Sequence, residues 1–289
     1  MINKLKKCRF CSSTDYAPLF IKDNYEIAKC NSCNFIFLNF APTKGFLVNY
    51  YSEDFFNDKG TKHGFSNYEK ESSNIQKSFK ERIEILRKHQ NSGSLLDIGC
   101  ATGTFMEIAT NYWKVFGIEI SPYATKVAKK KGLNISGGTL EDRPYKNAKF
   151  DVITLWDTIE HLPDPVNTVK LLGNMVKLNS IIALTTGDVG SMASRISGKY
   201  WHLYNIPQHL SYFNRRSISD LLNKGGFKIK EITYPPVYFT LDYILFRLLT
   251  FYNLKFAMPL YNMLSNKNLL DINLKINLHD IMMVVAQKK

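Results

Sequence analysis

The segment from Leu95 to Phe105, LLDIGCATGTF, constrains the fold of this chain most strongly. Its apolar start is typical of a buried strand, small residues follow at alternate positions, and a helical pattern begins at Met106. Small residues in such a turn let backbone N–H groups approach a ligand closely, and a helix N-terminus adds positive potential. The segment therefore predicts a nucleotide-like ligand at a strand-turn-helix junction.

Apolar, strand-like runs then alternate with helix-like segments to the end of the chain. Further strands are expected at 115–120, 134–138, 150–155, 180–186, 227–234 and 279–286. This alternation predicts an α/β fold with a doubly wound, seven-stranded, mostly parallel sheet. Ligands of such sheets bind at the carboxyl ends of the strands, where we expect one crevice lined by Asp97, Glu119, Leu140 and Asp157.

The acidic residues at these strand ends indicate the kind of nucleotide. A dinucleotide-binding turn reads GxGxxG, whereas here the carboxylate of Asp97 precedes the glycines. A pyrophosphate would be repelled by that carboxylate, and a cationic ligand would be attracted to it. Glu119, at the end of the next strand, is well placed for the hydroxyls of a ribose.

With Glu160-His161-Leu162, these residues resemble the signature of class I S-adenosylmethionine (SAM)-dependent methyltransferases, over about 95–234 and the last strand. The resemblance implies a Rossmann-like methyltransferase fold with SAM as cofactor. It also implies roles for matching residues. The amino-acid part of SAM would be held by Asp97, Gly99, Ala101 and Gly103, the ribose by Glu119, the adenine by Ile120 and Leu140, and the methionine side would be closed by Asp157.

Ala101 departs from the glycine that the family has at the middle of this loop. Alanine is the smallest substitute, so we expect an altered contact and retained binding, provided that its φ is negative.

Four of the five cysteines form two CxxC pairs, Cys8 with Cys11 and Cys30 with Cys33. Two such knuckles present four thiolates to one tetrahedral ion, which predicts a structural Zn²⁺ site in a small ribbon at 1–45. A zinc ribbon can bind nucleic acid or a partner protein, but we favour the role of holding together a segment too small for its own core.

The segment 46–92 contains many aromatic residues and then a helix expected from Tyr68 to His89. It is read either as a lid over the ligand or as a packed linker, with a slight preference for the lid. The aromatic side chains are Phe46, Tyr50, Tyr51, Phe55, Phe56 and Phe65.

Three further features indicate a particular subgroup of these methyltransferases. They are the zinc ribbon, the Tyr50-Tyr51 region and the segment from Tyr200 to Phe213. Together they are similar to zinc-ribbon methyltransferases of bacterial sugar and surface-polysaccharide pathways. This implies O-methylation of a sugar, a nucleotide sugar, or a capsule or lipopolysaccharide precursor.

Transfer of a methyl group to a hydroxyl requires an aligned nucleophile and a base that removes its proton. Histidine suits this role near neutral pH. The candidates are His209, in a loop after the fifth strand, His161, after the fourth, and His202; a structural role is the alternative for each.

An insertion at about 235–270 precedes the last strand within the methyltransferase domain expected at 93–289. Its apolar residues at helical spacing predict a packed helix, and its charges leave no run of 18 apolar residues that could span a membrane. The alternatives are a cover over the substrate, a dimer contact, or peripheral contact with a membrane.

The net charge and the N-terminal residues bear on the partners and the location of the protein. The net charge of +13 is mostly diffuse, and the polar first ten residues lead us to expect a cytoplasmic protein without a secretory signal.

The leading interpretation is a small-molecule methyltransferase of the Rossmann-like fold. An RNA methyltransferase that uses the ribbon and basic surface is the second, although the fourth strand lacks the Pro-Pro-aromatic set that grips a flipped base. A non-catalytic cofactor- or partner-binding module is the third.

Overall fold

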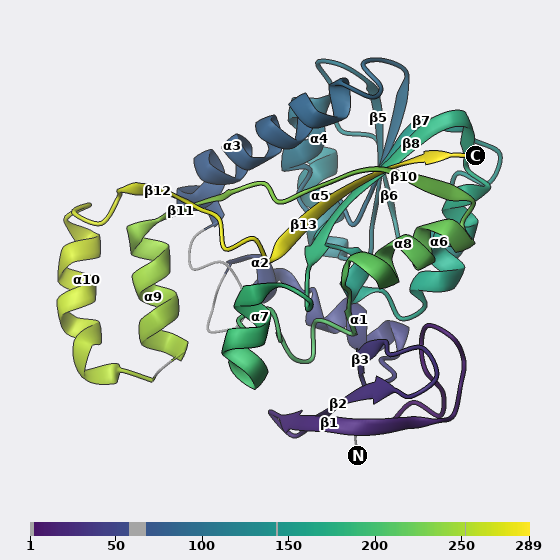
Figure 1. The fold of residues 1–289 in the computed structure, drawn as a ribbon. Helices are drawn as coiled ribbons and strands as arrows, with labels where there is room; N and C mark the ends of the chain where they lie inside the picture. The colour runs from purple at the N-terminus through teal and green to yellow at the C-terminus, as the bar shows by residue number, and fades with distance from the viewer. Residues whose placement is uncertain (1–2, 58–67, 143, 252) are drawn as a thin grey trace.

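The computed structural model describes residues 3–57, 68–142, 144–251 and 253–289. Its centre is a seven-stranded sheet in the order β10-β13-β8-β7-β4-β5-β6 (Figure 1). Only β13 runs antiparallel to its neighbours, which confirms the predicted doubly wound, mostly parallel sheet. The strands are β4 (Ser94–Ile98), β5 (Lys114–Glu119), β6 (Ile135–Gly137), β7 (Phe150–Trp156), β8 (Val176–Gly187), β10 (Phe227–Thr233) and β13 (Ile281–Lys288).

Both faces of the sheet are buried, which explains the continuous apolar runs of its strands. Along β4, Leu95 packs into one core cluster and Leu96 into the other, because successive side chains of a strand point to opposite faces. Val152 and Ile153 of β7 divide in the same way. The main covering helices are α3 (Tyr68–Arg87), α4 (Thr104–Ala109), α5 (Pro122–Lys130), α6 (Pro165–Gly173) and α8 (Arg215–Lys224).

The order of strands places the carboxyl ends of β4, β5 and β7 together. β4 pairs with β5 on one side and with β7 on the other, and the chain leaves the three strands at this same edge. Asp97, Glu119 and Asp157 therefore lie at one edge of the sheet, as the sequence predicts.

The N-terminal segment is built into the main domain rather than tethered to it. β1 (Tyr16–Lys22), β2 (Tyr25–Cys30) and β3 (Ile36–Leu38) form an antiparallel sheet, and β9 (Ser211–Tyr212) adds a fourth strand from the main domain. The ring of Phe35 lies 5.3 Å from that of Phe213, and Arg9 donates to the carbonyl of Pro163 at 2.6 Å. The ribbon thus supports the loop that leads into β9.

The aromatic segment packs onto the domain where it is described. It forms α1 (Lys44–Tyr50) and α2 (Glu53–Asn57), whose rings contact one another in a chain. Phe56 stacks on Tyr123 of α5 at 5.9 Å, and the Ser121 hydroxyl donates to the carbonyl of Tyr51 at 2.5 Å. Phe65 lies outside the described residues.

The insertion before the last strand is more elaborate than one helix. Two strands, β11 (Val237–Thr240) and β12 (Asn273–Ile276), pair antiparallel and enclose α9 (Leu241–Phe251), the 3-10 turn η4 (Lys255–Ala257) and α10 (Met258–Asn266). The helical spacing predicted one helix, where α9 lies, whereas α10 and the two four-residue strands were not predicted. Among the described residues, none of the helices has the length and apolar character needed to cross a bilayer.

Candidate active site

Asp97 ends β4 as a buried carboxylate. Its Oδ1 accepts a hydrogen bond from Thr154 Oγ1 at 2.7 Å, and 2% of the residue is exposed. Burial raises the pKa of Asp97 to about 7, and the hydrogen bond from Thr154 opposes the shift. A carboxylate held in this way gains from a neighbouring cation, which the amino group of an amino-acid moiety would supply.

Glu119 connects two neighbouring loops. Its two carboxylate oxygens accept the N–H of Ala101 at 2.8 Å and the N–H of Ser121 at 2.7 Å. Burial raises the pKa of Glu119, whereas these N–H groups favour the ionised form. The carboxylate therefore fixes the glycine loop against the start of α5.

Two glycines of the loop are required by backbone geometry. Gly99 has φ +71°, and a Cβ there would lie 2.7 Å from the Thr158 hydroxyl. Gly103 has φ +83°, and a Cβ there would lie 2.3 Å from Leu133 Cδ1. Any larger residue would be strained at either position and would also collide with a neighbour.

Ala101 has φ +49°, so the condition of a negative φ, on which the expected retention of binding depended, is not met. The turn keeps the left-handed conformation that a glycine would adopt, because Glu119 holds the N–H of Ala101 in place. Alanine therefore contributes strain here as well as a methyl group.

We expect Ala101→Gly to raise the free energy of unfolding by about 1 kcal/mol, because glycine removes the left-handed strain. Chemical denaturation followed by circular dichroism measures this change. Ala109→Gly, at the buried last residue of α4, is the control and should lower stability, because glycine there loses a buried methyl group and gains backbone freedom in the unfolded chain. A loss of stability in both variants would contradict the assignment of strain.

Arg82 of α3 is a site residue that sequence reasoning missed. Its guanidinium lies 3.2 Å from Asp157 Oδ2 and 5.2 Å from the centre of the Trp156 ring. Asp157 itself has φ +49° and donates its N–H to Thr185 Oγ1 at 2.9 Å. The available signal was an arginine on the apolar face of a predicted helix, three residues after Phe79.

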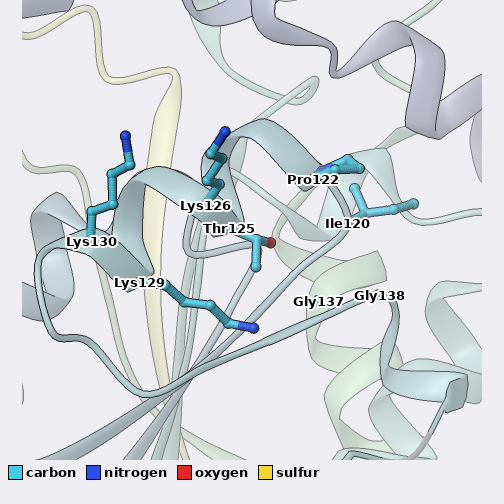
Figure 2. A pocket seen from close by; sticks show the side chains of 8 residues that line it. All are labelled: Ile120, Pro122, Thr125, Lys126, Lys129, Lys130, Gly137 and Gly138. Atoms are coloured by element: carbon cyan, nitrogen blue, oxygen red, sulfur yellow. The ribbon is translucent and has the colours of Figure 1, made fainter.

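The predicted adenine contacts lie beside a cavity of about 740 Å³ at the ends of β5 and β6 (Figure 2). Ile120 lines it, with Gly137 and Gly138 opposite and three lysines of α5 along one side. Leu140 is buried in the core, and neither it nor Asp97, Glu119 and Asp157 are part of the cavity wall. The lysines are Lys126, Lys129 and Lys130.

Two of the three candidate histidines lie together. The rings of His161 and His209 are 4.8 Å apart and nearly perpendicular. His161 Nδ1 lies 3.0 Å from the carbonyl oxygen of Gln208 and 3.1 Å from the Tyr51 hydroxyl, and His209 Nδ1 lies 2.8 Å from the carbonyl oxygen of Leu203. Because a carbonyl only accepts, each Nδ1 carries a proton, and in the neutral ring of His161 this leaves the lone pair on Nε2.

Glu160 completes this cluster, and the sequence analysis did not count it among the catalytic candidates. One ligand atom each of Glu160, His161 and His209 lies within 4.8 Å of the other two. Burial raises the pKa of Glu160 to about 8, assisted by the nearby Asp157, and burial lowers the pKa of His161 to about 4. The cluster therefore holds the neutral imidazole of His161 beside a carboxyl that ionises near neutrality.

His202 lies elsewhere at the same edge. Its Nε2 is 2.7 Å from Asp280 Oδ2, which also accepts the indole N–H of Trp201 at 2.9 Å. These two hydrogen bonds lower the pKa of Asp280, against its burial. The structure thus pairs His202 with a buried carboxylate and keeps it apart from the pair formed by His161 and His209.

The four cysteines of the two CxxC pairs converge on one point. Cys8 Sγ lies 3.8 Å from Cys33 Sγ, Cys11 Sγ lies 3.5 Å from Cys30 Sγ, and all four sulfurs lie within 4.8 Å of one another. The fifth cysteine, Cys100, is buried in the glycine loop. Four thiols at this spacing match the ligand set of a tetrahedral zinc site.

The sequence is similar to those of known methyltransferases. The family described as a methyltransferase domain matches residues 72–232, more than half of the chain. An uncharacterized protein of Methanocaldococcus jannaschii is 24% identical over 52% of this chain and 72% of its own length. The ubiquinone biosynthesis O-methyltransferase of Marinobacter nauticus is 26% identical over 53% of this chain and 69% of its own length.

A solved structure shares the fold. Magnesium protoporphyrin IX methyltransferase of Synechocystis, with SAH bound, superposes with a TM-score of 0.56 at 12% identity, over 86% of this chain and all of that one. At this identity the likeness concerns the fold alone.

Proposed function

This chain belongs to the methyltransferase-domain family and is a SAM-dependent methyltransferase, and on that premise we propose that it methylates a hydroxyl oxygen of a small molecule. The cluster of Glu160, His161 and His209 carries the proposal. It places proton-accepting groups close to Asp157, at the edge where SAM would bind.

The residues at this edge suit SAM. The buried carboxylate of Asp97 would pair with its amino group, and Glu119 would accept hydrogen bonds from the ribose hydroxyls. Ile120, next to the cavity in Figure 2, would contact the adenine. We infer that the small residues of the loop let its backbone approach the methionine part of SAM; they are Gly99, Ala101 and Gly103. We also infer that Asp157, which pairs with Arg82, closes the site on the methionine side.

SAM supplies an electrophilic methyl group on a sulfonium. Its transfer to a hydroxyl oxygen would replace the bond from carbon to sulfur by one from carbon to oxygen and would release the hydroxyl proton, which an imidazole Nε2 of the pair would accept. Ionised Glu160, close to both rings, stabilises the imidazolium that forms. The carbonyls of Gln208 and Leu203 keep the imidazoles oriented for this step.

The relatives named O-methyltransferases support an oxygen acceptor. A sugar, nucleotide-sugar or surface-polysaccharide acceptor stays a prediction from the arrangement of ribbon and methyltransferase domain. His202, paired with Asp280, is the second candidate for contact with the acceptor.

Labelled SAM tests the acceptor class directly. The purified chain is incubated with sugar nucleotides, with phenols and with RNA, and the products are separated and counted. We expect transfer to a hydroxyl-bearing small molecule, with sugar nucleotides as the first class to examine. Transfer to RNA alone would overturn the proposal.

The pH dependence of kcat should reflect the ionisation of Glu160. With saturating SAM, log kcat should rise with pH and level off near pH 8, because the carboxylate forms as the pH passes the pKa of Glu160. His161 should contribute no inflection near 6.5, because its pKa is about 4 and its ring stays neutral above pH 5.

Glu160→Gln should remove that inflection and lower kcat by about 100-fold at pH 8. His89→Gln, which changes a histidine paired with Glu231 outside the cluster, is the matched control and should keep the profile of the unchanged protein. An inflection that persists in Glu160→Gln would assign the titration to another group.

We also propose that the four converging thiols bind Zn²⁺. Thiolates bind zinc in their deprotonated form, and the closeness of the four sulfurs favours one shared ion over four separate thiols. The ion would hold β1 to β3 in place and, through β9, the loop that carries His209.

A further inference from the structure

Two exposed apolar elements lie at the edge of the sheet where the acceptor enters. α7 (Met192–Ser197) follows the carboxyl end of β8, and the insertion with α9 and α10 connects the end of β10 to the start of β13 (Figure 1). Because β13 runs antiparallel to β8 and β10, both ends of the insertion lie at this same edge.

The apolar side chains on these elements face solvent. Phe256 of η4 is 83% exposed, and Leu260 and Met263 of α10 are about half exposed. No residue of α10 is buried, although the helix is mostly apolar. On α7 and the following turn, Met192 and Ile196 are 77% and 81% exposed. Exposed apolar side chains grouped on neighbouring turns, as on η4 and α10, are one mark of an interaction surface.

Within the two stretches of sequence that carry these side chains, the charged residues are basic. The chain has no acidic residue between Asp242 and Asp271, where Arg247, Lys255 and Lys267 occur. It has none between Asp188 and Asp220 either, where Arg195 and Lys199 flank Ile196. Basic residues next to exposed apolar groups, on short helices that cannot span, are the pattern of attachment to anionic membranes.

The insertion is anchored next to the site. Glu81 of α3 accepts hydrogen bonds from the Tyr238 hydroxyl of β11 and from Lys275 Nζ of β12, the latter at 3.4 Å. The next residue of α3, Arg82, pairs with Asp157. The strands of the insertion are thus held against the helix that carries Arg82.

We propose that α7, η4 and α10 dock this enzyme onto the surface of a lipid bilayer containing anionic lipids, with the acceptor entrance toward the membrane. The inference rests on the proposed function only in taking this edge as the entrance. The basic residues of these stretches favour an anionic bilayer over a second copy of the chain, in which like charges would face each other.

Vesicle sedimentation tests the docking without any methyl transfer. The full chain is mixed with vesicles of phosphatidylcholine alone and with vesicles that also contain phosphatidylglycerol. We expect binding to the anionic vesicles that weakens with added salt, and at least tenfold weaker binding for the double variant Phe256→Ser, Leu260→Ser. Lys255→Glu with Lys267→Glu should weaken binding to the anionic vesicles alone.

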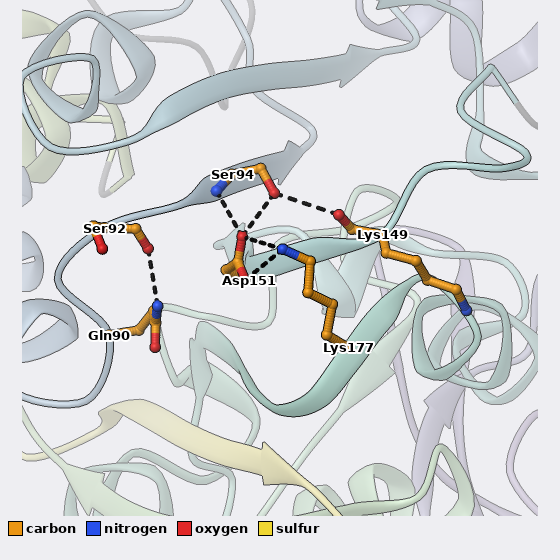
Figure 3. A network of polar contacts seen from close by, with 6 residues as sticks. All are labelled: Gln90, Ser92, Ser94, Lys149, Asp151 and Lys177. Carbon is orange, nitrogen blue, oxygen red and sulfur yellow. Dashed lines mark hydrogen bonds and ion pairs between the residues drawn. The ribbon is translucent and has the colours of Figure 1, made fainter.

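Leu178→Ser is the matched control. Leu178 is 77% exposed but lies near the start of β8, at the opposite edge of the sheet. There Asp151 accepts hydrogen bonds from Ser94 and Lys177 (Figure 3). This variant should bind vesicles like the unchanged protein.

Three results would overturn the docking. They are equal binding of all variants, no binding to anionic vesicles, and a stable dimer in light scattering that the Phe256→Ser, Leu260→Ser variant abolishes. SAM binding, measured by calorimetry on the same variants, should stay unchanged. A failure of docking would therefore be distinct from a failure of the methyltransferase assignment.

Discussion

Glu119→Gln should weaken SAM binding by about 100-fold, which corresponds to about 2.7 kcal/mol. Two N–H groups, from Ala101 and Ser121, point at the two oxygens of this carboxylate. Glutamine offers one acceptor oxygen and a donor amide, so one N–H would lose its partner and the glycine loop would shift. The negative charge and an acceptor for the ribose hydroxyls are lost at the same time. Isothermal calorimetry with SAM measures the change.

Glu107→Gln is the matched control for this variant. Glu107 is a half-exposed residue of α4, in the helix that follows the loop, and pairs with Lys131 at 2.7 Å. Its substitution should leave SAM affinity within about twofold of the unchanged protein. A Glu119→Gln variant that folds and keeps full affinity would show that SAM does not use this carboxylate.

Removal of the proposed zinc should destabilise the chain most. Cys30→Ser removes one of four ligands and should eliminate bound zinc, because structural zinc sites contribute about 10–16 kcal/mol to folding in isolated peptides. We expect a large fall in Tm and a loss of kcat, since β3 pairs with β9 only two residues after His209. Metal analysis and thermal unfolding measure both effects.

Cys100→Ala is the control for metal content. Cys100 is buried and lies outside the four-cysteine cluster, so its substitution should leave one zinc per chain. A purified chain without zinc, whose Tm does not change with a chelator, would contradict the zinc assignment.

The sequence predicted the elements whose patterns are local. The buried strands on both sides of the glycine loop, the capped start of α5 at Ser121 and Pro122, and the helix before β4 all appear at about the expected residues. The sequence also predicted that Asp97, Glu119 and Asp157 lie at one edge of the sheet, because the carboxyl ends of parallel strands meet at the same edge.

Contacts between distant segments could not be predicted in the same way. The pairing of β3 with β9, the approach of Arg82 to Asp157 and the meeting of Tyr51 with His161 each join residues far apart in the chain. The left-handed conformation of Ala101 was missed for another reason. A hydrogen bond from its N–H to Glu119 overrides the backbone preference of alanine.

The most direct test of the methyl-transfer assignment follows a deuterated methyl group. SAM labelled in this methyl is incubated with the purified chain and the best acceptor of the panel, and the product is analysed by mass spectrometry and nuclear magnetic resonance. We predict that the acceptor gains one deuterated methyl group on oxygen, together with one S-adenosylhomocysteine per turnover. A label found on carbon or nitrogen would contradict hydroxyl methylation, and no transfer despite tight SAM binding would contradict the assignment as an enzyme.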